Sequence, residues 1–208
     1  MLDLACGKGG DIAKWRDNNI DTCVGVDYIS NNIDDSRDGA CSRYQFYKSQ
    51  AEDQGKKIPK AYFLVGDVAR PMKDNKFITN SQYSTLANNL WFPNDKLTTN
   101  FQANKFDIVS VMFALHYFFR SESVLDQFIE NVANNVKQGG YFIGCCFNGS
   151  KIFESLKIKY FVLAVSEIFF NNHSCRILLI LFLSTAFFET FLLIAIATLR
   201  LVEASLNL

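Results

Sequence analysis

A glycine-rich turn directly behind a short apolar run is the feature that most constrains how this chain can fold. Residues 2–6 (LDLAC) are mostly apolar, and residues 7–10 (GKGG) follow at once. Asp11 then stands where a helix N-cap is expected, ahead of an apolar helical pattern over residues 12–15. The order predicts a buried strand, a tight turn and a helix, which is the opening unit of an α/β fold.

Four further buried strands are indicated along the chain, with helices between them. The expected strands are residues 22–26, 61–65, 106–113 and 140–146. A polar helical stretch containing Tyr44, Phe46 and Tyr47 precedes the third strand, and residues 121–136 form an amphipathic helix. This alternation predicts a mostly parallel, doubly wound sheet. Residues 70–104, rich in Asn, Thr and Ser, are expected to be a long insertion rather than a core element.

The composition changes near residue 150. All 11 Gly and all 3 Pro lie before that point, whereas residues 151–208 are dominated by Phe, Leu and Ile. The run 177–199 is long enough to cross a bilayer, but the carboxylate of Glu189 near its centre disfavours insertion. Three interpretations of this apolar tail stay open: a helix against the sheet edge, a membrane anchor, or mistranslated non-coding sequence. The A- and T-rich codons that such residues imply favour the last.

Charge and cysteine content exclude several classes of protein. Because 21 basic residues balance 21 acidic ones, any contact with nucleic acid must come from a local cluster of cations. The 6 cysteines form no CxxC pair, and only His116 and His173 could assist them, so neither a metal site nor a disulfide framework is expected. The start of the sequence has no basic segment ahead of a long apolar run, so we expect no signal peptide and a location in the cytosol or nucleus.

An acidic residue ends each of the next two expected strands, and with the glycine turn they outline a nucleotide site. A dinucleotide-binding GxGxxG fails because its third glycine would fall on Ile12. S-adenosylmethionine needs no pyrophosphate cradle, so its sulfonium end can lie over Gly7 and Gly9 while Asp27 accepts the ribose hydroxyls. Asp67 then lies where the adenine amine would arrive. The simpler alternative is that both aspartates are ordinary polar residues at strand ends.

Residues 2–11, followed by Lys14 and Trp15, resemble the signature of mRNA cap guanine-N7 methyltransferases. The resemblance continues through residues 25–27, 38–44, 113–119 and 139–144, and covers about residues 1–150. It implies a Rossmann-like class I methyltransferase fold over residues 1–150. It also implies that the upstream helix and the last strands of the family fold are missing, so that the domain is truncated at both ends.

The resemblance assigns roles to individual residues. It implies S-adenosylmethionine contacts at Ala5, Asp27, Asp67, Met112 and Tyr117, and cap contacts at Lys8, Lys14, Arg43 and His116. Ala5 stands where the family usually has glycine, and Met112 where it often has glutamine. Each residue also has a plainer interpretation: Lys14 and Arg43 as solvated helix charges, His116 as a core histidine, and Trp15 as packing.

The expected function is methyl transfer from S-adenosylmethionine to N7 of the guanosine cap of mRNA. Guanine N7 has a free lone pair, so positioning suffices and no catalytic acid or base is predicted. Expected partners are the capped 5′ end of mRNA and other capping or transcription proteins, in the nucleus or, for a viral protein, the cytoplasm. The alternatives are a membrane-tethered or non-catalytic protein that binds S-adenosylmethionine, and a methyltransferase with another substrate. Little activity is expected from this stretch alone.

Overall fold

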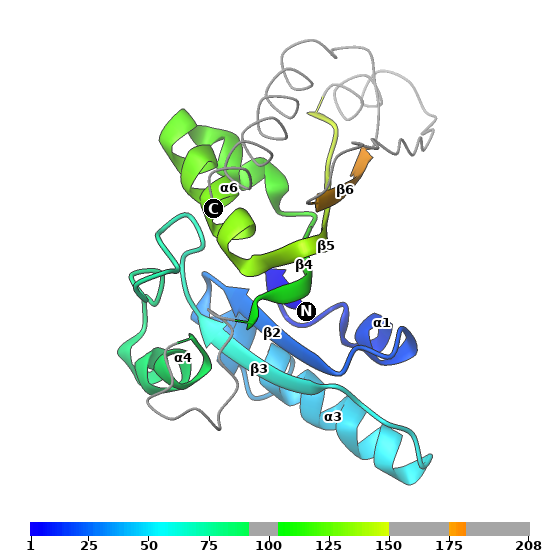
Figure 1. Ribbon diagram of the computed structural model, residues 1–208. Helices are drawn as coiled ribbons and strands as arrows, with labels where there is room; N and C mark the ends of the chain where they lie inside the picture. Colours follow the sequence, from blue (N-terminus) through cyan, green and yellow to red (C-terminus); the bar gives the residue numbers. More distant parts are fainter. Residues whose placement is uncertain (92–103, 150–174, 182–208) are drawn as a thin grey trace, which may run out of the picture.

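Six parallel strands lie side by side in the computed structural model, which describes residues 1–91, 104–149 and 175–181 (Figure 1). The strands are β1 (Leu2–Leu4), β2 (Thr22–Asp27), β3 (Lys60–Val65), β4 (Phe106–Met112), β5 (Val136–Cys146) and β6 (Cys175–Leu181). Their order is β3-β2-β1-β4-β5-β6. The chain runs outward from β1 to β3 and then returns to β4, so the order reverses between β1 and β4. The predicted doubly wound parallel sheet is confirmed.

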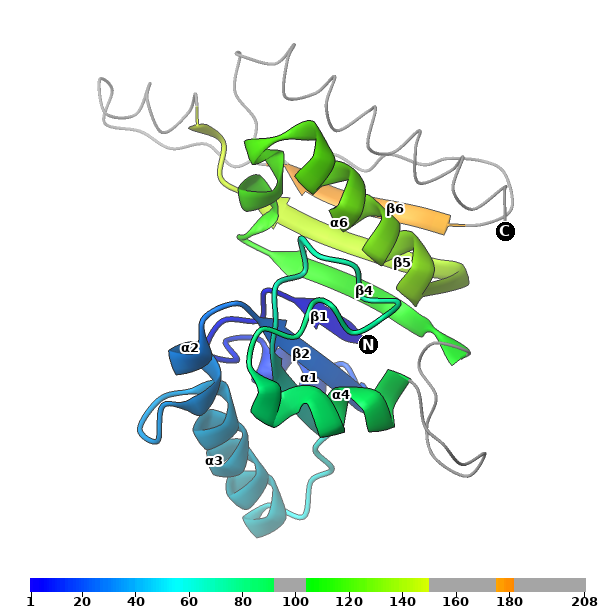
Figure 2. The same cartoon turned by 90° about the vertical axis from the view of Figure 1, so that its left-hand side faces the viewer.

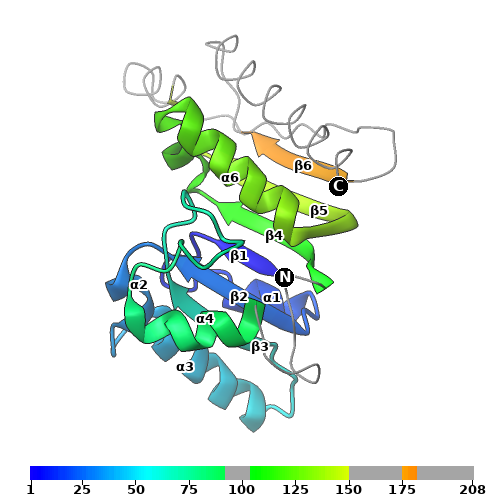
Figure 3. The same cartoon turned by 60° about the vertical axis from the view of Figure 1, so that its left-hand side comes forward.

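Helices cover both faces of the sheet. They are α1 (Ile12–Asp17), α2 (Ser30–Asp34), α3 (Ala40–Asp53), α4 (Ser84–Trp91) and α6 (Glu122–Asn135), with 3₁₀ turns η1 (Ser81–Tyr83) and η2 (Leu115–Arg120). Figures 2 and 3 show α4 and α6 together on one face, with α1 on the other. The amphipathic helix predicted over 121–136 is therefore confirmed as α6, with Ser121 as its N-cap.

The strand side chains alternate between two cores. Val24 and Val26 of β2 belong to the core under α4 and α6, whereas Cys23 of β2 belongs to the core under α1 and α3. In β3, Leu64 joins the first core and Phe63 the second. Side chains of a strand point alternately to opposite faces, and a parallel sheet has both faces covered. This explains why the strands are continuous apolar runs.

The expectation that residues 70–104 lie outside the core was wrong for the part that the structure describes. A parallel connection from β3 to β4 requires a crossover, and α4 within this stretch supplies it. The buried side chains of the segment are Met72, Phe77, Ala87, Leu90 and Trp91, all in the core under α4 and α6. The polar composition of this segment did not indicate its buried residues, because a helix that covers a sheet needs only one apolar stripe.

The expectation of an apolar helical tail needs a correction at residues 175–181. They form β6, which pairs in parallel with β5 from Gly140↔Cys175 to Cys146↔Leu181. Without β6, β5 would present an edge of unpaired N–H and C=O groups, and the run CRILLIL is a good strand sequence. The rest of the proposed membrane span, residues 182–199, lies outside the described residues. Among the helices of the described ranges, none is long and apolar enough to cross a bilayer.

Candidate functional site

The turn after β1 is held by backbone hydrogen bonds and left-handed residues. Cys6 N donates to Val26 O at 3.0 Å, and Gly9 N donates to Cys6 O at 3.0 Å. Gly9 has a φ of 70°, and a Cβ there would come within 2.6 Å of the Ile12 side chain. Glycine is favoured here, because a side chain would strain the left-handed backbone and would require the Ile12 side chain to move. Ala5 also takes a left-handed φ of 63°.

Asp27 joins this turn to the end of β2. Its carboxylate accepts hydrogen bonds from Gly7 N at 2.8 Å, Ile29 N at 2.9 Å and Asn32 Nδ2 at 2.9 Å. The side chain is buried. A carboxylate offers about four lone-pair sites, so roughly one acceptor position remains for a ligand. Asp27 therefore shapes the turn as well as being available to a ligand.

A pocket of about 380 Å³ opens above the turn, between the ends of β1 and β4. It brings together five of the predicted site residues: Ala5, Gly7, Lys8, Arg43 and Met112. The other lining residues, which the sequence did not single out for the site, are Asp3, Cys6, Gly10, Asp11 and Phe113. The pocket lies where the strand order reverses, at the carboxyl ends of the strands. This is the usual ligand position in open α/β sheets.

The three predicted phosphate-binding cations differ in their partners. Lys8 Nζ is 2.6 and 2.7 Å from the two carboxylate oxygens of Asp38. Lys14 Nζ lies 2.5 Å from Asp11 Oδ1, and this hydrogen bond raises the pKa of the Lys14 ammonium. Asp11 thus pairs with Lys14 and makes no side-chain cap for α1, which differs from the capping role expected of it. The Arg43 guanidinium has no polar partner among the described residues.

Aromatic rings gather beyond the end of β4. Phe113 and Phe147, both exposed, lie 5.4 Å apart between ring centroids. The ring of His116 lies 4.2 Å from that of Tyr117 and 6.1 Å from that of Phe147. Nδ1 of His116 is buried and has no hydrogen-bond partner in the described part of the chain. A buried polar atom of this kind is available to a ligand, since such atoms are seldom left unpaired.

Asp67 follows β3 at the same edge of the sheet, outside the lining of the pocket. It is only partly exposed, accepts a hydrogen bond from Ala69 N at 3.0 Å, and lies 3.4 Å from Arg70 Nε. Its backbone N donates to Phe77 O at 2.7 Å. The other predicted residues that do not line the pocket are Gly9, Lys14, Asp27, His116 and Tyr117. The predicted residues therefore surround a single edge of the sheet, although they do not all share one cavity.

Asp3 lies beneath the pocket, in the middle of β1. It is 2% exposed and accepts a hydrogen bond from Ser110 Oγ at 2.8 Å. Burial raises the pKa of its carboxyl to about 7, and the Ser110 hydrogen bond opposes this rise only in part. A signal was present in the sequence, because an acidic residue inside a buried apolar strand is unusual.

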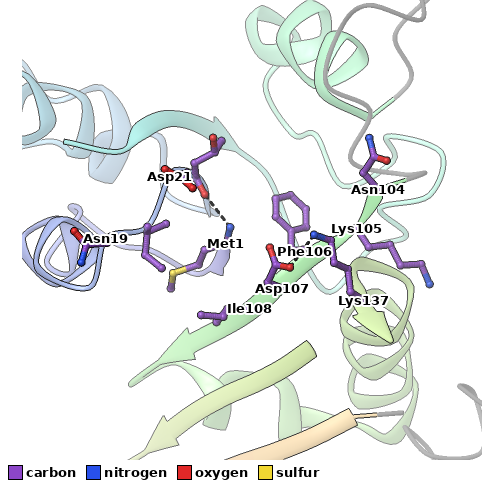
Figure 4. Close-up of a pocket in the computed structure, with 11 residues that line it drawn as sticks. Met1, Asn19, Asp21, Asn104, Lys105, Phe106, Asp107, Ile108 and Lys137 are labelled. Atoms are coloured by element: carbon purple, nitrogen blue, oxygen red, sulfur yellow. Dashed lines mark hydrogen bonds and ion pairs between the residues drawn. The ribbon is translucent and has the colours of Figure 1, made fainter. Parts of the chain in front are cut away.

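A second pocket lies at the opposite edge of the sheet (Figure 4). Four of its charged groups are already paired: Lys137 Nζ lies 2.7 Å from Asp107 Oδ1, the Met1 amine donates to Thr22 O at 2.8 Å, and Asp21 Oδ1 accepts from Lys57 Nζ at 2.5 Å. In the described residues, no group of three or more His, Cys, Asp or Glu side chains is placed to hold a metal. Cys6, Cys23, Cys41, Cys145 and Cys146 are free thiols.

Comparison with known proteins names the family. Residues 1–174 match the model described as the mRNA (guanine-N(7))-methyltransferase domain. The chain belongs to this family. The resemblance noted in the glycine turn and the segments after β2 and β4 is thereby confirmed, and so is the Rossmann-like fold class.

Two curated proteins agree with the match. A "Probable mRNA-capping enzyme" of Acanthamoeba polyphaga mimivirus is 30% identical over 159 residues, which are 76% of this chain and 13% of that protein. An "mRNA cap guanine-N(7) methyltransferase" of Neosartorya fischeri is 32% identical over 156 residues, which are 73% of this chain and 22% of that protein. A solved S-adenosylmethionine-dependent methyltransferase from Clostridium acetobutylicum has a TM-score of 0.40 at 17% identity, covering 82% and 49%. The chain spans only about an eighth to a fifth of these two curated relatives.

Proposed function

We propose that this domain transfers the methyl group of S-adenosylmethionine to N7 of the guanosine cap at the 5′ end of mRNA. The observation that carries the proposal is the pocket at the point where the strand order reverses. There Gly7, whose backbone N–H is bound by Asp27, lies beside Lys8 and Arg43. Polar backbone and a buried carboxylate suit the cofactor, and cations suit a triphosphate. Family membership supports the same reaction.

The turn and the strand ends fit S-adenosylmethionine. Asp27 retains acceptor capacity for a ribose hydroxyl, and Ala5 and Gly7 line the pocket. Met112 lines the wall from β4, where its thioether can pack on an apolar ligand surface. Asp67 is the acceptor proposed for the adenine amine, and Tyr117 is proposed to wall the cofactor. Gly9 contributes through the shape of the turn.

The three cations differ in how readily they can bind the cap phosphates. Arg43 is available to a phosphate directly, and its planar guanidinium can bind two oxygens at once. Lys8 and Lys14 first have to leave Asp38 and Asp11. Because these ion pairs are largely exposed, each stabilises the fold by at most about 1 kcal/mol, and a triphosphate can replace the carboxylate.

Methyl transfer in this site requires alignment rather than proton transfer. The cofactor supplies a methyl group on a cationic sulfur, and guanine N7 supplies the lone pair, so no side chain has to remove a proton. His116 can hydrogen-bond the guanine edge through its unpaired Nδ1, and the neighbouring rings of Phe113 and Phe147 can hold the base plane. We infer no catalytic acid or base.

The setting of the reaction is inferred from the same relatives. We propose that the domain comprises residues 1–150 and acts on capped mRNA beside other capping or transcription proteins. The place of action is the nucleus or, as the viral relative suggests, the cytoplasm of an infected cell. The division at residue 150 and the nature of residues 151–174 and 182–208 stay predictions.

Cofactor binding is tested first, by calorimetric titration with S-adenosylmethionine. Asp27→Asn should weaken binding by about 1.5 to 3 kcal/mol, the contribution of a hydrogen bond to a charged group. Asp35→Asn is the matched control, because Asp35 also accepts a backbone hydrogen bond, from Arg37 N at 2.9 Å, but its carboxylate makes no hydrogen bond to the glycine turn in the described structure. Thermal melts of both variants separate loss of the ligand contact from loss of the turn. Equal affinities for wild type and Asp27→Asn would remove Asp27 from the site.

Methyl transfer is tested with labelled S-adenosylmethionine and GpppA, using this chain beside a version extended at both ends from a full-length relative. We expect transfer to guanine N7 in the extended protein and its loss in Lys8→Ala and His116→Ala. Binding of S-adenosylmethionine without transfer to GpppA in either version would instead indicate a non-catalytic protein or another substrate. Full activity of this chain alone would show that it already holds every essential contact.

A further inference from the structure

We infer that Asn131 of α6 is a positioning residue for the adenine end of the cofactor site, because it holds the turn that carries Asp67. The inference rests on the proposed function, in which Asp67 meets the adenine. Asn131 lies on a different element, 59 to 63 residues along the chain from its partners in the turn, and nothing in its local sequence pattern suggests a role in a site.

The side chain of Asn131 is fully used by the segment behind Asp67. Its Nδ2 donates to Val68 O and to Arg70 O, both at 2.8 Å. Its Oδ1 accepts from Met72 N at 3.0 Å and from Gln127 Nε2 at 3.3 Å. Three of these four hydrogen bonds go to the backbone of residues 68–72. The amide therefore acts as the missing backbone partner of this turn.

The burial of Asn131 makes this arrangement costly to lose. The residue is 2% exposed, on the face of α6 that packs into the core. A buried amide is tolerated only when its hydrogen bonds are made, and removing it leaves Val68 O, Arg70 O and Met72 N without their side-chain partner. The turn would then be free to shift away from α6.

A shift of this turn would move the backbone N–H that binds the Asp67 carboxylate. Asp67 Oδ1 accepts from Ala69 N at 3.0 Å, and Ala69 lies between the two carbonyls that Asn131 holds. The orientation of the Asp67 carboxylate thus depends on the backbone that Asn131 fixes. Loss of Asn131 should misplace Asp67 without removing it.

Asn135 provides a matched control one helical turn away. It is 4% exposed and also hydrogen-bonded, but it accepts from Trp91 Nε1 at 3.0 Å and donates to Asn131 O at 2.8 Å. Its Nδ2 also lies 3.9 Å from Met72 Sδ, but its side chain makes no hydrogen bond to the backbone of residues 67–72 in the described structure. A general loss of stability should therefore appear in both variants, and misplacement of Asp67 in one.

The experiment measures S-adenosylmethionine affinity and amide hydrogen exchange in Asn131→Ala, Asn135→Ala, Asp67→Ala and the Asn131→Ala/Asp67→Ala double variant. In Asn131→Ala, affinity should fall about two- to tenfold, the range for one hydrogen bond, while the affinity for GpppA stays unchanged. Exchange should become faster at residues 67–72. Asn135→Ala should keep the wild-type affinity, and its exchange should rise no more at residues 67–72 than in the rest of the core. Asn131→Ala should add nothing to the loss of affinity once Asp67 is gone.

The outcomes separate the inference from the proposed function. Unchanged affinity in Asn131→Ala, or an equal fall in Asn135→Ala, overturns the positioning role. An additive effect in the double variant also overturns it, because the two residues would then act independently. If the wild type does not bind S-adenosylmethionine, the proposed function fails. The exchange measurement still decides whether Asn131 holds the turn.

Discussion

Two residues beside the pocket adopt backbone conformations that L-amino acids avoid. Ala5 has a φ of 63° and Phe113 a φ of 57°, at the ends of β1 and β4. A left-handed conformation costs a non-glycine residue about 1 to 2 kcal/mol. Strain of this kind persists when the surrounding structure imposes it, and here both residues line the same pocket.

Ala5→Gly should stabilise the protein by about 1 kcal/mol, because glycine adopts this φ without a Cβ penalty. The pocket keeps its shape, so S-adenosylmethionine affinity should stay equal or rise. Urea unfolding and calorimetry measure the two quantities. Ala133→Gly serves as the control, since glycine inside the helix α6 should lower stability instead. A loss of stability in Ala5→Gly would contradict the strained conformation.

At the scale of elements, the segment between β3 and β4 is attached to both of its neighbours. On one side the Tyr83 hydroxyl bonds Asp34 of α2, and on the other Asn131 of α6 binds residues 68–72. Trp91, the last residue of α4, is 1% exposed and packs against Phe77 with ring centroids 5.6 Å apart. This segment therefore belongs to the core, and its position fixes the backbone next to Asp67.

Trp91→Ala should lower the free energy of unfolding by about 3 to 5 kcal/mol, as removal of a large buried aromatic side chain usually does. Asn89→Ala, at an exposed position of the same helix, should change it by less than about 0.5 kcal/mol. Urea denaturation followed by circular dichroism gives both values. Near-wild-type stability of Trp91→Ala would mean that the segment is dispensable for the core.

For the whole molecule, the buried carboxyl of Asp3 links stability to pH. Its pKa is about 7 in the folded protein and has its ordinary value near 4 in the unfolded chain. The folded state therefore binds the proton more tightly, and stability falls as pH rises from about 4 through 7. The aspartates with lowered pKa, such as Asp107 beside Lys137, act in the opposite direction and only below about pH 4.

Wild-type stability should fall by about 2 to 4 kcal/mol between pH 4.5 and pH 8 on account of Asp3. Asp3→Asn keeps an acceptor for Ser110 but carries no charge, so this part of the pH dependence should disappear. Asp107→Asn, in contrast, should retain the wild-type slope in this window. Urea unfolding at several pH values measures it, and identical slopes in wild type and Asp3→Asn would show that Asp3 does not cause the dependence.

The elements that could be predicted from the sequence are those that local chemistry specifies. The glycine turn, the apolar strands and Asp27 at a strand end could be located because turn geometry and side-chain periodicity act over a few residues. Lys8, Arg43 and Met112 were placed by resemblance, and the fold brings them to one pocket. Five of the predicted residues thus line one cavity, which no local sequence pattern could predict.

Tertiary structure alone decided the features that depend on distant partners. Trp91 is buried because Phe77 and Phe106 surround it, β6 is a strand because β5 offers an edge, and Asn131 is buried because a turn far away in the chain needs its amide. Hydrogen bonds and burial are satisfied wherever the folded chain brings groups together. The sequence by itself determined the unit that builds the site, and packing between remote segments decided how that unit is held.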